Sequence, residues 1–186
     1  MRVISGIARG LKLNTPTDNE IRPTTDRVKE SMFNIINSQV YDSVVLDLFS
    51  GSGALGIECI SRGAREAYFC DKSNNSIKVL KSNLDKAKFN EKSHIITGDF
   101  NVAIKKLASQ GKKFDLIFVD PPYYEGLFND VLKAINDYGI LDEEGTIIVE
   151  HDAGIELEDL GDLYIYKEKK YGITKLTFYG LEEDDE

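Results

Sequence analysis

From residue 44 onward, the chain alternates between short apolar runs and longer segments whose apolar residues recur at helical spacing. The apolar runs predict strands at 44–49, 67–70, 94–97, 114–119 and 146–149. The intervening segments predict helices at 54–62, from a cap at Ser73 to Ala87, near 100–109 and near 126–138. Strands that are apolar throughout and separated by helices are typical of a parallel sheet covered on both faces. The sequence therefore predicts an α/β fold.

The two ends of the chain depart from this alternation. Segments 163–169 and 173–179 alternate in polarity around Tyr171-Gly172, which predicts an antiparallel hairpin that completes a mostly parallel, seven-stranded sheet. Residues 1–13, punctuated by Gly6 and Gly10, predict a small hairpin, and a helix capped by Asp26 follows at about 26–38. We expect an N-terminal extension (1–40), a sheet domain (41–180) and an acidic tail (181–186), in effect one domain.

The distribution of charge indicates whether the protein is suited to bind nucleic acid. A formal net charge of −9 argues against nucleic acid, because phosphate binding depends on Lys and Arg. However, residues 1–13 contain Arg2, Arg9 and Lys12 without an acid, and residues 165–175 contain four lysines against Glu168. Charge alone leaves open whether these residues form a basic edge or are scattered over the surface.

Several classes of protein are disfavoured. No apolar run approaches the roughly 18 residues of a membrane span, and the first residues lack the layout of a signal peptide. Cys59 and Cys70 lie in apolar stretches and are expected to be reduced, which favours the cytoplasm. With only His94 and His151, no metal-ligand pattern is evident.

Ligands of such sheets bind beyond the carboxyl ends of the strands, so the residues that follow each strand are candidates. After the first strand, Gly51, Gly53 and Gly56 form G-x-G-x-x-G, where glycine permits a tight turn and close approach to a ligand. This motif alone is a weak signal, because dehydrogenases and ordinary tight turns share it. Asp71, after the second strand, is suited to bind ribose hydroxyls or to cap a helix. Asp99 and Phe100, after the third, are suited to contact adenine, although a helix cap is an equal alternative.

The fourth predicted strand is followed by Asp120-Pro121-Pro122-Tyr123. This motif distinguishes a methyl-donor cofactor from a dinucleotide. The prolines fix the backbone and remove two N–H donors, leaving the Asp120 carboxylate and the Pro121 carbonyl as acceptors. Two acceptors can hold the protons of a planar exocyclic amine, and Tyr123 offers a face on which a base can stack. A hydride-transfer enzyme has no use for this arrangement. The motif therefore favours methyl transfer to nitrogen. The alternative is that the two prolines simply end the strand and start a loop.

Other polar residues near these turns carry less weight. His151 follows the fifth strand and could line the same cleft, although a lone histidine is more often structural, and Glu150 could support the site. Ser50 and Ser52 lack a partnering histidine in the sequence, so a serine nucleophile is not expected.

The quoted motifs resemble those of class I S-adenosylmethionine (SAM)-dependent amino-methyltransferases, which have a Rossmann-like fold. The segments Arg2–Gly6, Arg9–Leu13, Arg22–Glu30 and Lys170–Gly172 resemble, more closely, the RsmD family, whose members methylate N2 of one guanine in 16S ribosomal RNA. The resemblance covers nearly the whole chain. Leu11, where relatives often have a basic residue, and the acidic tail depart from the pattern.

The resemblance implies a role for each matching position. The implied SAM-binding residues are Asp47, Phe49, Gly51, Gly53, Asp71, Lys72, Asp99 and Phe100. The implied site of the target amine is Asp120, Pro121, Pro122 and Tyr123. The implied substrate-binding residues are Arg2, Arg9, Lys12, Arg22, Thr24, Arg27 and Lys170, with 22–27 forming a lid. The implied partner is 16S rRNA in an assembled or assembling small ribosomal subunit, bound by a monomer without metal.

Three rival functions stay open at this point. A DNA adenine-N6 methyltransferase would share Asp120–Tyr123 but usually needs an added target-recognition region. A non-catalytic nucleic-acid-binding module is disfavoured by the intact glycines and acids. A dinucleotide oxidoreductase would share only the glycine turn and Asp71.

Overall fold

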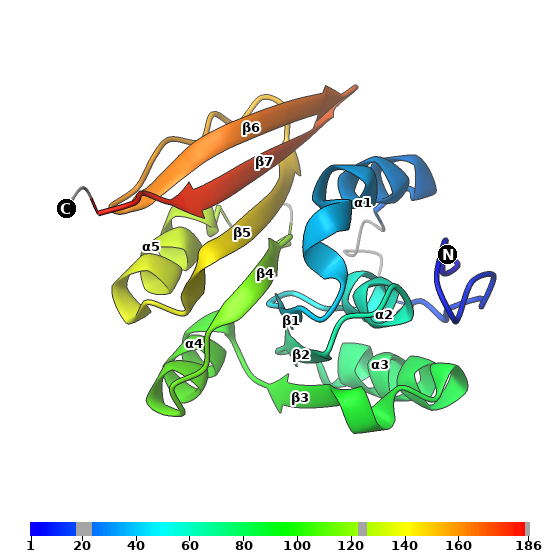
Figure 1. The fold of residues 1–186 in the computed structure, drawn as a ribbon. Coiled ribbons are helices and arrows are strands. Elements are labelled where there is room, and N and C mark those ends of the chain that lie inside the picture. Colours follow the sequence, from blue (N-terminus) through cyan, green and yellow to red (C-terminus); the bar gives the residue numbers. More distant parts are fainter. Residues whose placement is uncertain (18–23, 123–125, 185–186) are drawn as a thin grey trace.

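The computed structural model describes residues 1–17, 24–122 and 126–184. Its centre is a seven-stranded sheet in the order β3-β2-β1-β4-β5-β7-β6 (Figure 1). The strands are β1 (Val44–Asp47), β2 (Glu66–Asp71), β3 (Ser93–Thr97), β4 (Phe114–Val119), β5 (Leu141–Asp152), β6 (Leu163–Tyr171) and β7 (Thr174–Leu181). The helices are α1 (Asp26–Val40), α2 (Ala54–Ser61), α3 (Asn74–Ala87), α4 (Phe100–Ser109) and α5 (Phe128–Tyr138), with a short 3₁₀ turn at Asn90–Lys92.

The sheet is parallel from β3 through β5, and the hairpin of β6 and β7 adds to β5 in the antiparallel direction. Helices α1, α2 and α3 cover one face, and α4 and α5 cover the other (Figure 1). Each face buries its own apolar cluster, one centred on residues such as Phe33 and Phe118, the other on residues such as Leu46 and Ile135. This arrangement confirms the predicted fold class. None of the helices described is long and apolar enough to cross a membrane.

Two local predictions were wrong, and a third was confirmed in a shortened form. Thr25, not Asp26, caps α1, because its hydroxyl accepts the Val28 amide. β5 starts at Leu141 rather than 146, since exposed acidic residues hide its pattern. Residues 1–13 do form the expected hairpin, although it is short: Arg2 and Lys12 make an antiparallel bridge, the Val3 amide donates to the Leu11 carbonyl at 2.9 Å, and the Leu13 amide donates to the Met1 carbonyl at 2.8 Å. The next amides, those of Ile4 and Ser5, bond instead to the Glu58 carboxylate, which ends the strand pairing.

The parallel strands place the segments that follow β1, β2, β3, β4 and β5 at one edge of the sheet. Val3 and Leu13 are buried in the same apolar cluster as α1, α2 and α3, so the N-terminal extension packs on that face, and Met1, Thr15 and Pro16 reach the cavity at this edge. Segments far apart in the sequence therefore surround a common space.

Candidate active site

A cavity of about 620 Å³ opens at the carboxyl ends of the strands. This volume falls within the usual range of sites for small molecules and cofactors. Its wall includes the predicted residues Thr24, Asp47, Phe49, Gly51, Asp71, Lys72, Asp99, Phe100, Asp120, Pro121 and Pro122. The structure thus brings the glycine turn after β1 and the proline turn after β4 to one cavity.

The three glycines of the turn have different roles. Gly51 has a left-handed backbone (φ +51°), and a Cβ there would meet no atom within 4 Å, so its surroundings leave room for a ligand. A Cβ on Gly53 would lie 2.3 Å from Leu80 Cδ1, and one on Gly56 would lie 2.3 Å from Phe69 Cε1. Gly53 was expected to bind the cofactor, but it does not line the cavity: it packs against α3.

Asp71 joins β2 to the glycine turn. One carboxylate oxygen accepts the Gly51 amide at 2.9 Å, and the other accepts the Ser73 amide at 2.8 Å. Ser73, as expected, caps α3. Each oxygen of a carboxylate has two lone pairs, so Asp71 can also accept hydrogen bonds from a ligand diol in the cavity.

Asp99 and Phe100 form another part of the wall. Asp99 is the cap of α4, because its side chain accepts the Val102 amide at 2.9 Å. Phe100 is buried, and its ring centroid lies 6.1 Å from that of Phe49. The two rings give the cavity an apolar side suited to a planar heterocycle.

Asp47 is a buried carboxylate in the cavity wall. Burial raises its pKa to about 7, the hydrogen bond from the Gly56 amide opposes this rise, and the charge of Asp71 adds to it. Among the described residues, three buried side-chain atoms have no hydrogen-bond partner: Asp47 Oδ2, Ser50 Oγ and Ser76 Oγ. All three residues line this cavity. Unsatisfied buried polar atoms around one space indicate a site for a polar ligand.

The turn after β4 and the last residues of β5 form a further part of the cavity wall. Asp120 and Pro122 are half-buried and Pro121 is buried, so the acceptor-rich turn borders the cavity. Thr24 Oγ1 donates to Glu150 Oε2 at 2.6 Å, which ties the segment before α1 to the end of β5.

His151 lines the same wall. Its Nε2 lies 2.7 Å from Thr177 Oγ1, and its Nδ1 lies 2.9 Å from the Asp152 carbonyl oxygen. Burial lowers the pKa of His151, although the hydrogen bond with the Asp152 carbonyl opposes this. A neutral ring donates from Nδ1 to that carbonyl and accepts from Thr177 at Nε2. This arrangement fixes one tautomer and favours a structural role.

Comparison with known proteins shows the family. The family model described as conserved hypothetical protein 95 matches residues 1–180. The Bacillus subtilis protein YlbH is 40% identical over 180 residues, which is 96% of this chain and 98% of its own. Ribosomal RNA small subunit methyltransferase D of Escherichia coli is 33% identical over 187 residues, 100% of this chain and 92% of its own. The chain belongs to the RsmD family.

The fold of this RsmD-family protein agrees with that of a solved relative. The Escherichia coli protein yhhF superposes with a TM-score of 0.85 at 33% identity over 98% of both chains. The family match stops before the acidic residues 182–186, so it gives the tail no role.

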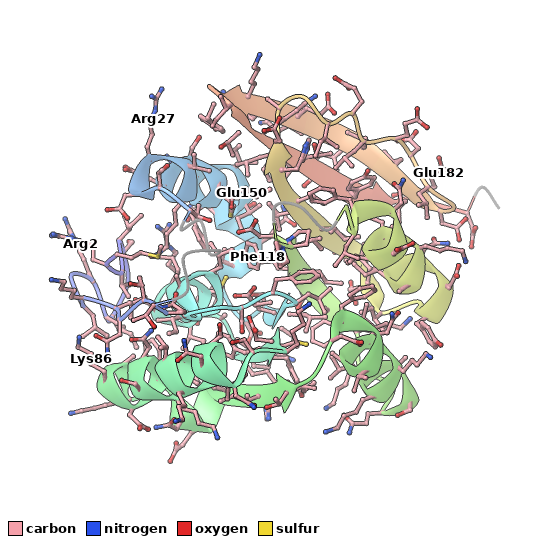
Figure 2. The ribbon with its side chains drawn as sticks, turned by 180° about the vertical axis from the view of Figure 1, so that it is seen from behind. Arg2, Arg27, Lys86, Phe118, Glu150 and Glu182 are labelled. Carbon is pink, nitrogen blue, oxygen red and sulfur yellow. The ribbon has the colours of Figure 1, made fainter. Side chains whose placement is uncertain are left out.

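The basic substrate residues implied by the RsmD resemblance lie outside the cavity wall. Arg2, Arg9, Lys12 and Arg27 are exposed, and Figure 2 shows Arg2 and Arg27 pointing outward on the same side of the molecule. Lys170 is exposed on β6, opposite Lys175 on β7. Two further positions, Arg22 and Tyr123, lie outside the described residues.

Lys29, which was not among the residues expected at the site, lines the cavity and is fully buried. A signal for it existed: Lys29 shares a helical face with Met32, Phe33 and Ile36, and a lysine in an apolar stripe requires a buried partner. That partner, Glu58, is distant in sequence. Within the described segments, no group of three or more His, Cys, Asp or Glu residues is arranged to hold a metal ion.

Proposed function

We propose that this RsmD-family protein methylates the N2 amine of a guanine in 16S rRNA, within an assembled or assembling small ribosomal subunit. The observation that carries the proposal is the single cavity shared by the glycine turn at Gly51 and the proline turn at Asp120–Pro122. The Escherichia coli relative is named for the small-subunit rRNA reaction, which agrees with this assignment.

The cavity residues fit SAM. Asp47 Oδ2 offers a buried carboxylate to a cationic group, Asp71 faces the cavity with acceptors for a ribose, and Phe49 and Phe100 provide an apolar wall for adenine. SAM supplies an activated methyl group, so the protein needs neither a covalent intermediate nor a metal.

The target amine is assigned to the turn after β4. The Asp120 carboxylate and the Pro121 carbonyl accept its two protons, and the prolines contribute no competing N–H. Holding both protons aims the nitrogen lone pair at the methyl donor, which is catalysis by orientation. The nitrogen can lose its proton after transfer. The base must leave any stack to reach the cavity, so an unpaired or flipped guanine is expected.

The partner and setting complete the proposal. We infer that the protein acts as a monomer in the cytoplasm on a ribonucleoprotein, where contacts to ribosomal proteins add to those with RNA. Such a substrate agrees with a net charge of −9, because phosphate contacts then need not supply all of the affinity.

The test is transfer of labelled methyl from SAM to unmodified small subunits, protein-free 16S rRNA and DNA, followed by mapping of the modified base. We expect one N2-methylguanine in the subunits. Methylation of adenine in DNA would instead support the rival adenine-N6 enzyme. Absence of SAM binding in calorimetry would leave only a binding module.

A further inference from the structure

Besides residues 165–175, two segments of this acidic protein carry a net positive charge. Residues 1–13 contain three basic side chains and no acid. Residues 72–92, which include all of α3, contain six lysines against Asp85 and Glu91. The rest of the chain is therefore even more acidic than the net charge of −9 indicates.

The fold places these two segments side by side. Lys86 Nζ on α3 donates to the Lys12 carbonyl at 2.5 Å. Two residues later, the Asn14 side chain donates to Ser82 Oγ on α3 at 3.1 Å. Figure 2 shows Arg2 and Lys86 on one side of the molecule and Glu182 on the opposite side. The basic segments thus form one surface, on the side away from Glu182.

Buried polar groups fix this surface relative to the cavity. Asn83, fully buried on α3, accepts the Asn14 amide at 2.8 Å and donates to the Asn14 carbonyl at 2.9 Å. The same Asn83 side chain donates to the Ser52 carbonyl in the glycine turn at 2.9 Å. The N-terminal extension is therefore held to the cofactor side of the cavity, and little ordering entropy remains to be lost on binding.

Helix α3 begins at the cavity and runs beside the glycine turn, which its Asn83 contacts. Lys72, Ser73 and Ser76 line the cavity at its start, whereas Lys78, Lys81 and Lys86 are exposed farther along. At 1.5 Å per residue this 14-residue helix is ~20 Å long. This length can follow several nucleotides of an RNA strand.

We propose that the exposed side of α3 and residues 1–13 form one phosphate-binding surface, which holds the RNA backbone outside the catalytic cavity. The proposal rests on the proposed function and adds to it a place for the RNA outside the cavity. Lysines bind phosphate without reading sequence, so this surface positions the substrate while the cavity selects the base. Acidic parts of the surface elsewhere, such as that at Glu182, repel RNA and thereby favour this orientation.

The experiment compares wild type with the double variant Lys78→Glu/Lys81→Glu. Steady-state methylation of unmodified small subunits is measured at several salt concentrations, with SAM affinity by calorimetry and folding by thermal melting. We expect KM for subunits to rise about tenfold or more, and kcat/KM to fall less steeply with salt, because fewer phosphate contacts form. The values of kcat, SAM affinity and Tm should stay close to wild type.

The matched control is Lys105→Glu/Lys106→Glu, which reverses two exposed lysines on α4, on the other face of the sheet. It makes the same change in net charge and should change KM much less. Equal KM values for the two double variants would overturn the proposal, because net charge alone would then explain the effect. A wild-type protein that methylates no small subunit would refute the proposed function itself, which is a separate outcome.

A second measurement identifies the partner. Binding of labelled, protein-free 16S rRNA should weaken at least about fivefold in Lys78→Glu/Lys81→Glu. If this variant binds the free rRNA as wild type does and fails only on assembled subunits, the surface contacts a ribosomal protein and the phosphate assignment is wrong.

Discussion

The ammonium of Lys29 lies 2.9 Å from the carboxylate of Glu58, and both side chains are fully buried. The second Glu58 oxygen lies 2.9 Å from Arg62 Nε, and the carboxylate also accepts the amides of Ile4 and Ser5. One acidic side chain on α2 thus fastens α1 and the N-terminal extension to the sheet domain. Burial would raise the pKa of Glu58, but the charge of Lys29 and these hydrogen bonds lower it below its ordinary value.

Replacing Glu58 with Ala should reduce the free energy of unfolding by about 3–5 kcal/mol, because it leaves Lys29 buried without its partner. Urea denaturation at neutral pH measures this change. The exposed pair of Arg65 and Asp42, at 3.0 Å, is the control, and Arg65→Ala should cost far less, because an exposed ion pair contributes little to stability. Similar losses in the two variants would contradict the role assigned to Glu58.

Replacing Asp47 with Asn should stabilise the protein increasingly as pH rises. The pKa of Asp47 is about 7 in the folded state, above its ordinary value of 3.8, so the folded protein binds this proton more tightly than the unfolded chain. The associated stability is present below pH 4 and is lost as pH rises through 7. Melting at pH 5 and pH 8 tests this, with an expected gain of about 2–4 kcal/mol for Asp47→Asn at pH 8. A pH-independent difference between the two proteins would exclude this titration.

The same carboxylate should make SAM affinity depend on pH. A cationic ligand favours ionised Asp47, so wild-type affinity should increase between pH 6 and pH 8. Calorimetry over this range measures the effect, and Asp47→Asn should bind SAM more weakly with a flatter pH profile. A steep profile that persists in the variant would assign the dependence to another group.

Replacing Asp120 with Ala should lower kcat at least about 10²-fold, because one of the two acceptors for the target amine is lost. SAM affinity should stay within a few fold, since the glycine turn and Asp71 are untouched. Single-turnover methylation and calorimetry measure the two quantities. Unchanged turnover would refute the role of Asp120.

Replacing Gly56 with Ala should reduce stability by about 1–3 kcal/mol, because the new Cβ would lie 2.3 Å from the buried Phe69 ring. Gly180→Ala is the control, since its Cβ would meet Tyr164 at an ordinary 3.4 Å. Thermal melting of both variants measures the difference. If Gly56→Ala melts like Gly180→Ala, close packing is not why glycine is needed at 56.

Much of the fold could be predicted because it depends on local periodicity. The expected strand at 114–119 and helix at 100–109 have the bounds of β4 and α4. Asp71, Asp99 and Asp120 each follow or end a predicted parallel strand. Because the carboxyl ends of parallel strands lie at one edge of the sheet, the sequence predicted that these three residues lie close together. The start of β5 escaped prediction, because its exposed acids interrupt the apolar pattern.

By itself, the sequence determined which segments are strands and helices and which turns carry the glycines, acids and prolines of the site. Only the tertiary structure decided the partners of the buried polar groups: Glu58 for Lys29, Asn14 and Ser52 for Asn83, and Thr24 for Glu150. The physical reason is that apolar periodicity is a local property, which can be recognised within a short segment of sequence. A buried charge or amide, in contrast, forms its hydrogen bonds with whichever distant group the packing brings near. The tertiary structure also decided that the lysines of α3 share a surface with residues 1–13.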